Sequence, residues 1–330
     1  MAEADRYVLG IDIGGTKLIT GAVRIDGGDL VGLRSTWTLA QTGADDILQR
    51  LVSQVREVIA DLEHARPGAR LLGMGIGAPG PLDREKGVVF LAPNLGWRNF
   101  PLRERLFTEL GLPSALENDA NCAVLGEAWR GAARGVQHVV GVTIGTGIGG
   151  GLVFDGKLFH GASDCAGEIG HATIDTDGRR CNCGNYGCLE AYASGPAIAL
   201  RCAEQIESGA ESSLTTILGG DLSQLTAQMV YDAAEQGDDV ALDVVTSTAR
   251  FLGVGIANLI NILNPHAVVI CGGVTRAGDR LFVPLRREVA RRAFKPAVAA
   301  CRIIPGELIG TAGVWGAARA FLDAHPAIDA

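Results

Sequence analysis

The chain has 330 residues, of which 47% are hydrophobic and 20% charged, with a formal net charge of −8. This length favours two domains, and the composition is that of a globular protein rather than a disordered or fibrous one. The acidic balance argues against partners bound mainly through nucleic-acid phosphates or acidic lipid heads, so we expect no nucleic acid and no membrane partner. The N-terminal "MAEADR" lacks the features of a signal peptide, and we predict a cytoplasmic location.

Strands and helices alternate along the first part of the chain. In "VLGIDIGG" (8–15) a β-branched apolar strand runs into a glycine turn, and apolar residues at helical spacing predict a helix over 45–65. A buried strand that ends in a Gly-Pro loop is expected at 71–81, followed by a helix over 101–113 that Gly111 closes. This alternation predicts α/β lobes with mixed sheets.

The opening strand and turn recur once. "VVGVTIGT" (139–146) matches "VLGIDIGG" at a constant offset, so that Gly14 corresponds to Gly145. A third strand and turn is expected in "AVVICGGV" (267–274). Two lobes that each begin with the same unit would explain the repeat, and coincidence between apolar strands is the alternative.

Glycine turns after strands suggest phosphate handling, because backbone N–H groups approach an anion closely where side chains are absent. "GTGIGG" (145–150) satisfies the dinucleotide fingerprint, which requires a helix to open at the turn. The following residues instead predict two strands joined at Asp155-Gly156. "GLVFDGKL" (151–158) fails as a P-loop, since Leu158 stands where Ser or Thr would bind Mg²⁺. We therefore expect neither a Rossmann nor a P-loop site.

Two later segments predict helices. "SGPAIALRCAEQIESG" (194–209) opens with a Ser cap and an early proline. "FLGVGIANLINIL" (251–263) is too short to span a bilayer and is typical of a buried helix that stops at Asn264-Pro265.

Three of the eight cysteines gather in "CNCGNYGCLE" (181–190), with C-x-C-x4-C spacing. His171, ten residues upstream of the first of them, is the closest candidate for a fourth ligand, and Cys3His is a common structural zinc set. The alternative is a glycine-rich loop with incidental thiols. The other cysteines are expected to be small buried hydrophobes, namely Cys122, Cys165, Cys202, Cys271 and Cys301.

Six motifs together resemble the ROK family of sugar kinases and repressors, and look closest to its glucose-phosphorylating bacterial members. They are "DIGGTK" (12–17), "GAPGP" (77–81), "ENDAN" (117–121), "GTGIGGG" (145–151), "EIGH" (168–171) and "CNCGNYGCLE" (181–190). The resemblance implies the α/β, actin-like ATPase fold, with two ribonuclease-H-like lobes around a central cleft. We expect residues 1–120 to form the smaller lobe, with the C-terminal helix 311–323 as a candidate to complete it, and residues 121–310 to form the larger lobe with the zinc loop.

The resemblance also implies ATP-dependent transfer of the γ-phosphoryl group to the 6-hydroxyl of glucose, giving glucose 6-phosphate and ADP. Asp119 matches the family's catalytic base and Asn118 a group that holds a neighbouring hydroxyl, although the Asn-Asp pair by itself would favour a helix cap. Glu168, His171 and Glu190 match groups that hydrogen-bond to sugar hydroxyls. His171 would use one ring nitrogen for zinc and offer the other to the sugar.

Cofactor contacts follow from the same resemblance. The implied nucleotide and phosphate contacts are Asp12, Gly14, Gly15, Thr16, Lys17, Gly145, Thr146, Gly147, Gly272 and Gly273. Asp12 would help to hold Mg²⁺ through water, whereas a solvated lysine is the default for Lys17. The implied ligands of structural Zn²⁺ are His171, Cys181, Cys183 and Cys188.

Several alternatives stay open. The substrate of a kinase could be another hexose such as N-acetylmannosamine, mannose or fructose, and the phosphate donor could be polyphosphate instead of ATP. A ROK repressor would carry an N-terminal helix-turn-helix, for which we expect no room before the first strand, and a non-catalytic sugar sensor is the third option. Family members commonly form homodimers or homotetramers, and we expect one of these assemblies.

Overall fold

The computed structural model describes residues 5–329, which form two compact units. Unit 1 lies within Met1–Gln137, Gly151–Gly167 and Glu307–Ala330, and unit 2 comprises His138–Gly150 and Glu168–Gly306. The predicted lobe boundary at residue 120 falls inside a helix of unit 1, and that unit also includes the C-terminal helix.

Unit 1 is built on a five-stranded sheet of order β3-β2-β1-β4-β8, with a three-stranded sheet β5-β6-β7 beside it in the chain. Its strands are β1 (Arg6–Ile13), β2 (Lys17–Arg24), β3 (Leu30–Trp37), β4 (Arg70–Ala78), β5 (Leu82–Asp83), β6 (Val88–Ala92), β7 (Trp97–Phe100), β8 (Ser114–Asn118) and β11 (Lys157–Leu158). Its helices are α1 (Ala44–Ala65), α2 (Leu102–Leu110), α3 (Asp119–Arg130), α11 (Ala312–Ala324) and α12 (Pro326–Asp329), with short 3-10 turns η1 (Ala40–Thr42) and η2 (Pro93–Leu95). Strand β1 runs antiparallel to β2 and parallel to β4.

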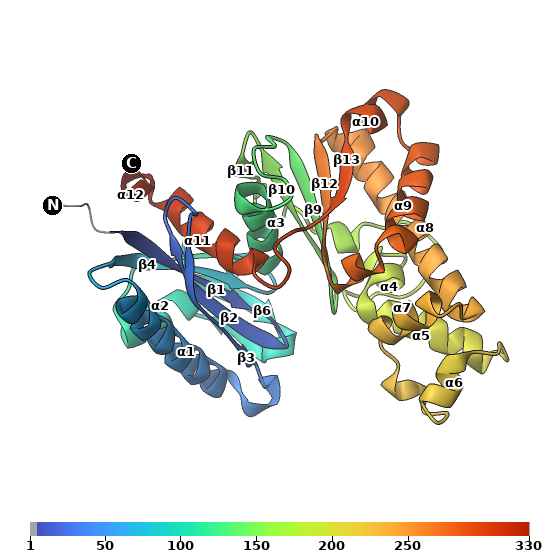
Figure 1. Ribbon diagram of the computed structural model, residues 1–330, viewed down its shortest axis with the longest axis horizontal. Helices are drawn as coiled ribbons and strands as arrows, with labels where there is room; N and C mark the ends of the chain where they lie inside the picture. Colours follow the sequence, from blue (N-terminus) through green and yellow to red (C-terminus); the bar gives the residue numbers. More distant parts are fainter. Residues whose placement is uncertain (1–4, 330) are drawn as a thin grey trace. The chain divides into compact units, whose positions relative to one another are not determined.

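Alternation along β1 divides its side chains between two cores, as the period of a strand requires. Leu9 and Ile11 pack in the core that also contains the apolar face of α1, whereas Val8 packs with Phe321 of α11 on the other face of the sheet. Figure 1 shows α1 on one side of this sheet and α11 on the other. A Cβ at Gly10 would lie 2.0 Å from the carbonyl oxygen of Val314, so glycine lets α11 pack directly on β1.

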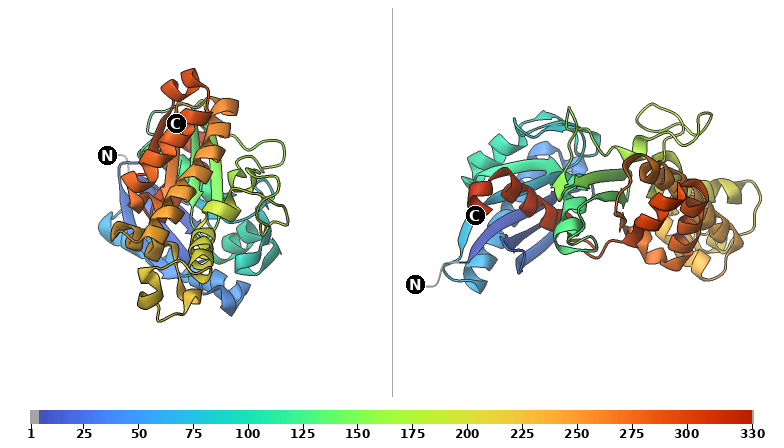
Figure 2. Two further views of the ribbon diagram at one scale, coloured as in Figure 1. Left: turned by 90° about the vertical axis from the view of Figure 1, so that its right-hand side faces the viewer. Right: turned by 90° about the horizontal axis from the view of Figure 1, so that it is seen from above.

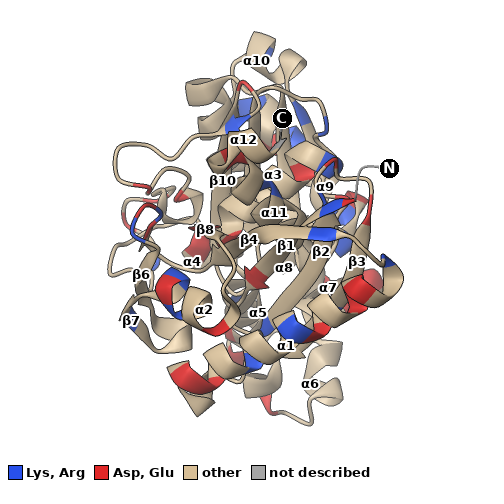
Figure 3. Cartoon of the chain, turned by 90° about the vertical axis from the view of Figure 1, so that its left-hand side faces the viewer, with Lys and Arg blue, Asp and Glu red and all other residues tan. Residues whose placement is uncertain are grey.

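The exposed surface of unit 1 carries both signs of charge. In Figure 3 acidic and basic residues are interspersed along α1. Arg34 of β3 forms ion pairs of 2.8 Å with Asp61 and 2.9 Å with Glu57, both on α1. Exposed pairs of this kind stabilise a fold by at most about 1 kcal/mol each, so the apolar cores dominate.

Unit 2 contains three parallel strands, in which β12 lies between β9 and β13 and pairs with both. Its strands are β9 (Val139–Ile144), β12 (Ala267–Gly272) and β13 (Arg302–Pro305), and β10 (Ile148–Phe154) crosses from unit 2 into unit 1. Its helical segments are η3 (Ile169–His171), α4 (Glu190–Ala193), α5 (Gly195–Glu207), α6 (Ser213–Ile217), η4 (Leu222–Gln224), α7 (Ala227–Glu235), α8 (Asp239–Leu263), η5 (Gly273–Ala277), α9 (Asp279–Arg292) and α10 (Lys295–Ala300). Helix α8 contacts α5, α7 and α9, which form the yellow-to-red cluster in Figure 2.

Helix α8 is the one helix among residues 5–329 that is long and apolar enough to cross a membrane. In this structure 61% of its most apolar stretch is buried inside the protein, as expected of a core helix. Asp238 caps its N-terminus, and Asn264 ends it in the left-handed conformation. The predicted buried helix that stops at Asn264 is therefore confirmed.

Other local predictions are confirmed as well. Asp155 and Gly156, with φ of 51° and 75°, form the turn between β10 and β11. No helix opens after the glycine turn at 145–150, where β10 follows instead, so the dinucleotide fingerprint is correctly rejected. The prediction for Cys165 is wrong: this residue is exposed, because it lies in a polar loop where its thiol faces the carbonyl oxygen of Ser163 at 3.2 Å.

Candidate active site and metal centre

The junction of β8 and α3 carries the first pair of candidate residues. Asn118 has extended backbone geometry, and its Oδ1 accepts hydrogen bonds from the N–H groups of Ala120 at 2.9 Å and Asn121 at 3.1 Å. Asn118 is thus the N-cap of α3, as the Asn-Asp pair by itself predicts. The cap uses only the oxygen of the amide, so Nδ2 stays suited to donate to a ligand.

Asp119, the first residue of α3, shares unit 1 with Asp12 near the end of β1. Burial, together with the charge of Asp119, raises the pKa of Asp12 to about 7. A Cβ at Gly313 would lie 2.3 Å from Asp12 Oδ2, so this glycine lets the first turn of α11 approach the carboxylate. Two carboxylates held in mutual repulsion are the donor set that a hard cation such as Mg²⁺ prefers, and the residues present fit that ion.

The glycine turn between β1 and β2 is held at Gly14 by hydrogen bonds and is exposed at its tip. Gly14 donates its N–H to Lys17 O at 2.9 Å, and Thr38 Oγ1 donates to Gly14 O at 2.7 Å. Gly15 and Thr16 are exposed. A supported turn with an exposed tip suits contact with a phosphate group.

Lys17 begins β2, and its Nζ lies 5.2 Å from the centroid of the Trp37 ring. This cation–π contact places the ammonium group over β3.

In unit 2 two further glycine turns occupy the ends of neighbouring parallel strands. Gly145 donates to Gly147 O at 2.9 Å and accepts from Gly195 N at 2.9 Å, while Thr146 is exposed. At the end of β12, Gly272 has φ of 103°, and a Cβ there would lie 2.0 Å from Ile144 O. Glycine at position 272 therefore allows the backbones at the ends of β12 and β9 to approach closely, whereas a Cβ at Gly273 would meet no atom within 4 Å.

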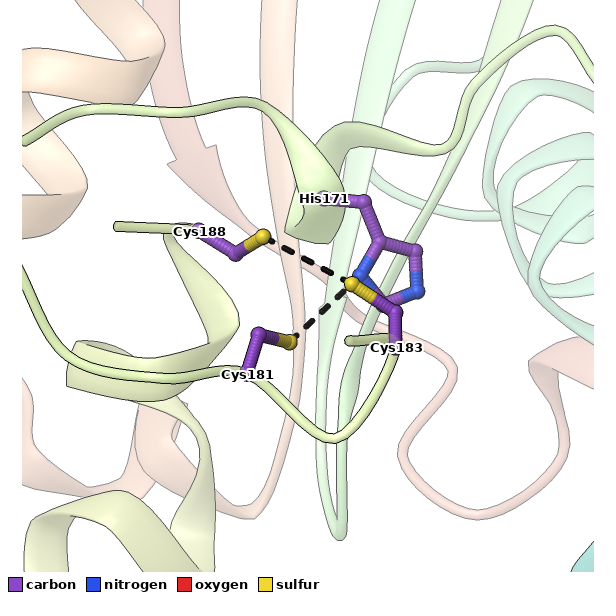
Figure 4. Close-up of side chains that lie close together, drawn as sticks. All are labelled: His171, Cys181, Cys183 and Cys188. Carbon is purple, nitrogen blue, oxygen red and sulfur yellow. Dashed lines mark hydrogen bonds between the residues drawn. The ribbon is translucent and has the colours of Figure 1, made fainter. Parts of the chain in front are cut away.

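The four candidate zinc ligands converge in unit 2. Figure 4 shows His171, Cys181, Cys183 and Cys188 pointing toward one another, and their ligand atoms all lie within 4.8 Å of one another. Cys183 Sγ lies 3.8 Å from Cys188 Sγ, and Cys181 Sγ lies 3.8 Å from His171 Nδ1. A tetrahedral zinc ion with Zn–S bonds of about 2.3 Å separates its sulfur ligands by about 3.8 Å. The spacing fits such an ion and is too long for a disulfide.

The backbone of residues 181–188 forms a tight loop that brings these thiols together. Cys181 N–H donates to Asn185 O at 2.8 Å, and Thr173 forms a β-bridge with Cys188. Burial raises the pKa of the Cys188 thiol to about 12, whereas the backbone N–H of Asn185 lowers that of Cys183. A divalent cation would favour the thiolate forms, because metal binding requires deprotonated cysteines.

The imidazole of His171 faces two groups with its two nitrogens. Its Nδ1 lies toward the thiols, and its Nε2 lies 4.0 Å from Oε2 of Glu168, which precedes the η3 turn. At 4.0 Å the separation from Glu168 is too long for a hydrogen bond. The predicted use of one ring nitrogen for zinc and of the other for the sugar stays a prediction.

Glu190 begins α4, two residues beyond Cys188, and does not simply face solvent. Its Oε2 accepts a hydrogen bond of 2.7 Å from the N–H of Ile148, and its Oε1 lies 3.9 Å from Cys181 Sγ. A Cβ at Gly147 would lie 2.5 Å from the same Oε2. One oxygen of the predicted sugar-binding carboxylate is therefore bound to the backbone next to a predicted phosphate turn, a contact that sequence reasoning missed.

Sequence reasoning also passed over a cluster of three residues around Glu117, which lies two residues before Asp119. Glu117, at 1% exposure, lies between His160 at 2.8 Å and Arg84 at 2.9 Å. Glu117 is the first letter of the "ENDAN" motif, so a signal was available; His160 and Arg84 had none.

Comparison with known proteins gives the family. The ROK family model matches residues 8–324. The chain belongs to the ROK family. A glucokinase of Thermotoga maritima is 40% identical over 312 residues, which cover 94% of this chain and 96% of that enzyme. A putative xylose repressor of a Caldicellulosiruptor species is 37% identical over 290 residues, which cover 87% of this chain and 71% of the repressor.

A solved structure of a ROK glucokinase from Streptomyces griseus, in complex with glucose and AMPPNP, superimposes with a TM-score of 0.81 at 32% identity. The match covers 96% of this chain and 99% of that one. This ROK protein therefore has the actin-like ATPase fold of ROK sugar kinases, and the predicted α/β fold class is confirmed. The family contains both kinases and repressors, so membership alone does not decide between them.

Proposed function

We propose that this ROK protein is a glucokinase, which transfers the γ-phosphoryl group of ATP to the 6-hydroxyl of glucose and releases glucose 6-phosphate and ADP. The observation that carries the proposal is the pair of carboxylates in unit 1, Asp12 on β1 and Asp119 at the start of α3. A sugar-responsive repressor needs no base and no magnesium ligand. The glucokinase relatives of Thermotoga maritima and Streptomyces griseus support glucose and ATP as the substrates.

Asp119 is the proposed general base, which accepts the proton of the 6-hydroxyl as that oxygen attacks phosphorus. Phosphoryl transfer depends chiefly on positioning and charge stabilisation, and a positioned base adds roughly 10²- to 10⁴-fold in rate. Asn118 would donate from Nδ2 to a neighbouring hydroxyl while its Oδ1 continues to cap α3. One residue thus orients the substrate and the helix that carries the base.

Asp12 is the proposed carboxylate that holds Mg²⁺ through water. The bound cation would offset the negative charge of the transferred phosphoryl group. In unit 1 the exposed turn of Gly14, Gly15 and Thr16 would offer backbone N–H groups to phosphate, and in unit 2 the turn of Gly145–Gly147 would do the same. Gly272 and Gly273 are proposed to lie next to the nucleotide base, and Lys17 is proposed as a further phosphate contact.

In unit 2 Glu168, His171 and Glu190 are the proposed partners of sugar hydroxyls. Zn²⁺ on His171, Cys181, Cys183 and Cys188 would be structural, since four protein ligands leave no open coordination position. The thiol loop would then keep His171 and Glu190 in fixed positions. A cytoplasmic location and assembly as a homodimer or homotetramer complete the proposal.

The test is a coupled assay of ADP release across glucose, mannose, fructose, N-acetylglucosamine and N-acetylmannosamine, with polyphosphate as the alternative donor. Glucose with ATP should give the highest kcat/KM. A site that bonds hydroxyl groups rejects analogues lacking them by roughly 10⁴-fold, because its own polar groups are left unpaired. If an acetylated sugar outranks glucose, the glucokinase assignment is wrong but the kinase assignment stands. Absence of turnover with every sugar, alongside measurable sugar binding, would instead identify a sensor.

A further inference from the structure

A buried carboxylate without a role in the proposed chemistry lies two residues before the proposed base. Glu117 is the penultimate residue of β8 and is only 1% exposed. Its Oε1 accepts hydrogen bonds of 2.9 Å from the backbone N–H of Asn118 and 2.9 Å from Nδ2 of Asn121. These two partners flank Asp119 in the chain, so one oxygen atom holds the backbone on one side of the base and a side chain on the other.

The second oxygen of Glu117 is held by groups from elsewhere in unit 1. Oε2 lies 2.8 Å from Nε2 of His160 and 2.9 Å from Nε of Arg84. Arg84 also lies 3.7 Å from Oδ1 of Asp164, in the same segment as His160. Burial acts to raise the pKa of Glu117, but the hydrogen bond with His160 and the charges of His160 and Arg84 hold it below its ordinary value.

The cost of burying a carboxylate makes the partners of Glu117 important. A buried carboxylate is costly unless its oxygens are hydrogen-bonded and its charge is offset, and removing one partner of such a group usually costs several kcal/mol. Each oxygen of Glu117 has two partners, one oxygen facing the start of α3 and the other facing His160 and Arg84. The orientation of the carboxylate that holds α3 is therefore set by His160 and Arg84.

We propose that Glu117, oriented by His160 and Arg84, is a positioning residue that fixes Asn118 and Asp119 for phosphoryl transfer. The inference rests on the proposed function, because it assigns Asp119 as the base. His160 and Arg84 act through Glu117 and touch neither sugar nor nucleotide in this scheme. A base displaced by about 1 Å loses on the order of 10²-fold in rate, which is the size of effect that such anchoring protects against.

A cavity beside the cluster of Glu117, His160 and Arg84 should let the protein tolerate substitutions at His160 and Arg84. A cavity of about 640 Å³ is lined by Arg84, Glu117 and His160 together with Asp323 of α11. The side chain of His160 is 20% exposed and that of Arg84 33%. Substitution of either therefore leaves a space that water can enter, and we expect the variants to fold.

The experiment compares His160→Leu, which removes the bond to Glu117, with His160→Gln, which keeps a donor at a similar position. His160→Leu should lower kcat for glucose by roughly 10- to 100-fold with little change in KM for ATP, and His160→Gln should recover most of the loss. His64→Leu, an exposed histidine on α1, is the matched control and should behave as wild type. Equal kcat values in all three variants would overturn the proposal.

Two further measurements separate positioning from a general loss of stability. In an Asp119→Asn background, His160→Leu should reduce the residual rate much less than it reduces the wild-type rate, because most of its effect passes through Asp119; two independent, multiplying losses would contradict the proposal. Hydrogen exchange of the amides of residues 118–122 should be faster in His160→Leu than in His160→Gln. This readout needs no turnover, so it tests the anchor even if the wild type proves inactive, in which case the proposed function alone fails. If the amide exchange rates of residues 118–122 in His160→Leu equal those of the wild type, the proposed positioning role of Glu117 is wrong.

Discussion

The backbone N–H of Ile148 donates a hydrogen bond of 2.7 Å to Oε2 of Glu190. Ile148 opens β10 directly after the turn of Gly145–Gly147, and Glu190 follows the last cysteine of the thiol loop. Within unit 2 a single carboxylate therefore connects the candidate metal centre with a candidate phosphate turn. A metal that fixes the loop of Cys181–Cys188 would therefore also help to fix the Gly145–Gly147 turn, through Glu190.

We expect Glu190→Ala to raise KM for ATP as well as KM for the sugar. The reason is that the Ile148 N–H would lose its acceptor, and hydrogen bonds to charged groups contribute roughly 1.5–3 kcal/mol, or about 10- to 150-fold in affinity. Glu190→Gln retains an oxygen for Ile148, so its KM for ATP should stay much closer to wild type. Steady-state kinetics with each substrate varied in turn provides the measurement.

Glu168→Ala is the matched control for this pair. Its carboxylate lies 4.0 Å from His171 Nε2, and the residue precedes η3 rather than beginning α4. It should therefore raise KM for the sugar while leaving KM for ATP unchanged. A KM for ATP that is the same in Glu190→Ala and Glu168→Ala would show that the bond to Ile148 has no functional consequence.

Asp119→Asn should abolish most turnover without disturbing the fold. The amide keeps the shape of the side chain, and its oxygen still accepts from the N–H of Ala120, which lies 2.8 Å from Oδ1 in the wild type. It is not able to take a proton, so kcat should fall by roughly 10²- to 10⁴-fold while sugar binding persists in calorimetry. Asp46→Asn, at an exposed position of α1, is the control. A variant that keeps more than about a tenth of the wild-type kcat would remove Asp119 from the role of base.

Local pattern predicts the elements of this fold well and the contacts of its sites less well. The turn at Asp155-Gly156 and the end of α8 at Asn264 follow from short-range backbone chemistry, and the structure has both. The partners of Glu117 and Glu190 do not follow in this way. His160 lies 43 residues from Glu117, and Ile148 lies 42 residues from Glu190.

Such long-range pairs depend on the packing of whole elements, which periodicity does not encode. The cysteine cluster was predictable because three ligands fall within eight residues and the fourth is ten residues away. Asn118 illustrates the intermediate case. Its capping of α3 follows from the local sequence, whereas a role toward a sugar rests on the family.

The metal prediction is one tightly held zinc ion per chain, on His171 and the three clustered cysteines. Cys183→Ala should lose the metal and weaken sugar binding, because His171 and Glu190 lose the loop that fixes them; structural zinc contributes on the order of 10 kcal/mol where it organises a fold. Elemental analysis of untagged protein and calorimetry with glucose measure both effects. Cys165→Ala, at the exposed cysteine outside the cluster, is the control and should retain zinc. Fully active protein without metal would refute the prediction.

The last prediction concerns acid stability and Glu117. Its pKa in the folded protein is held below the ordinary value of 4.5 by His160 and Arg84 despite burial, so in acid the unfolded chain binds more protons than the folded one. The stabilisation from this carboxylate is therefore complete above pH 4.5 and is lost as the pH falls through the folded-state pKa. Glu117→Gln lacks the titrating group and breaks a buried ion pair, which typically costs about 3–5 kcal/mol.

Urea unfolding of wild type and Glu117→Gln near neutral pH and at about pH 4 measures this effect. The difference in unfolding free energy between the two proteins should be largest near neutral pH and should shrink in acid. Loss of other interactions in acid affects both proteins and cancels in the difference. Glu104→Gln, at an exposed position of α2, is the control, and its unfolding free energy should differ little from that of wild type at both pH values. A Glu117→Gln difference that does not narrow in acid would mean that the ionised form of Glu117 does not stabilise the start of α3.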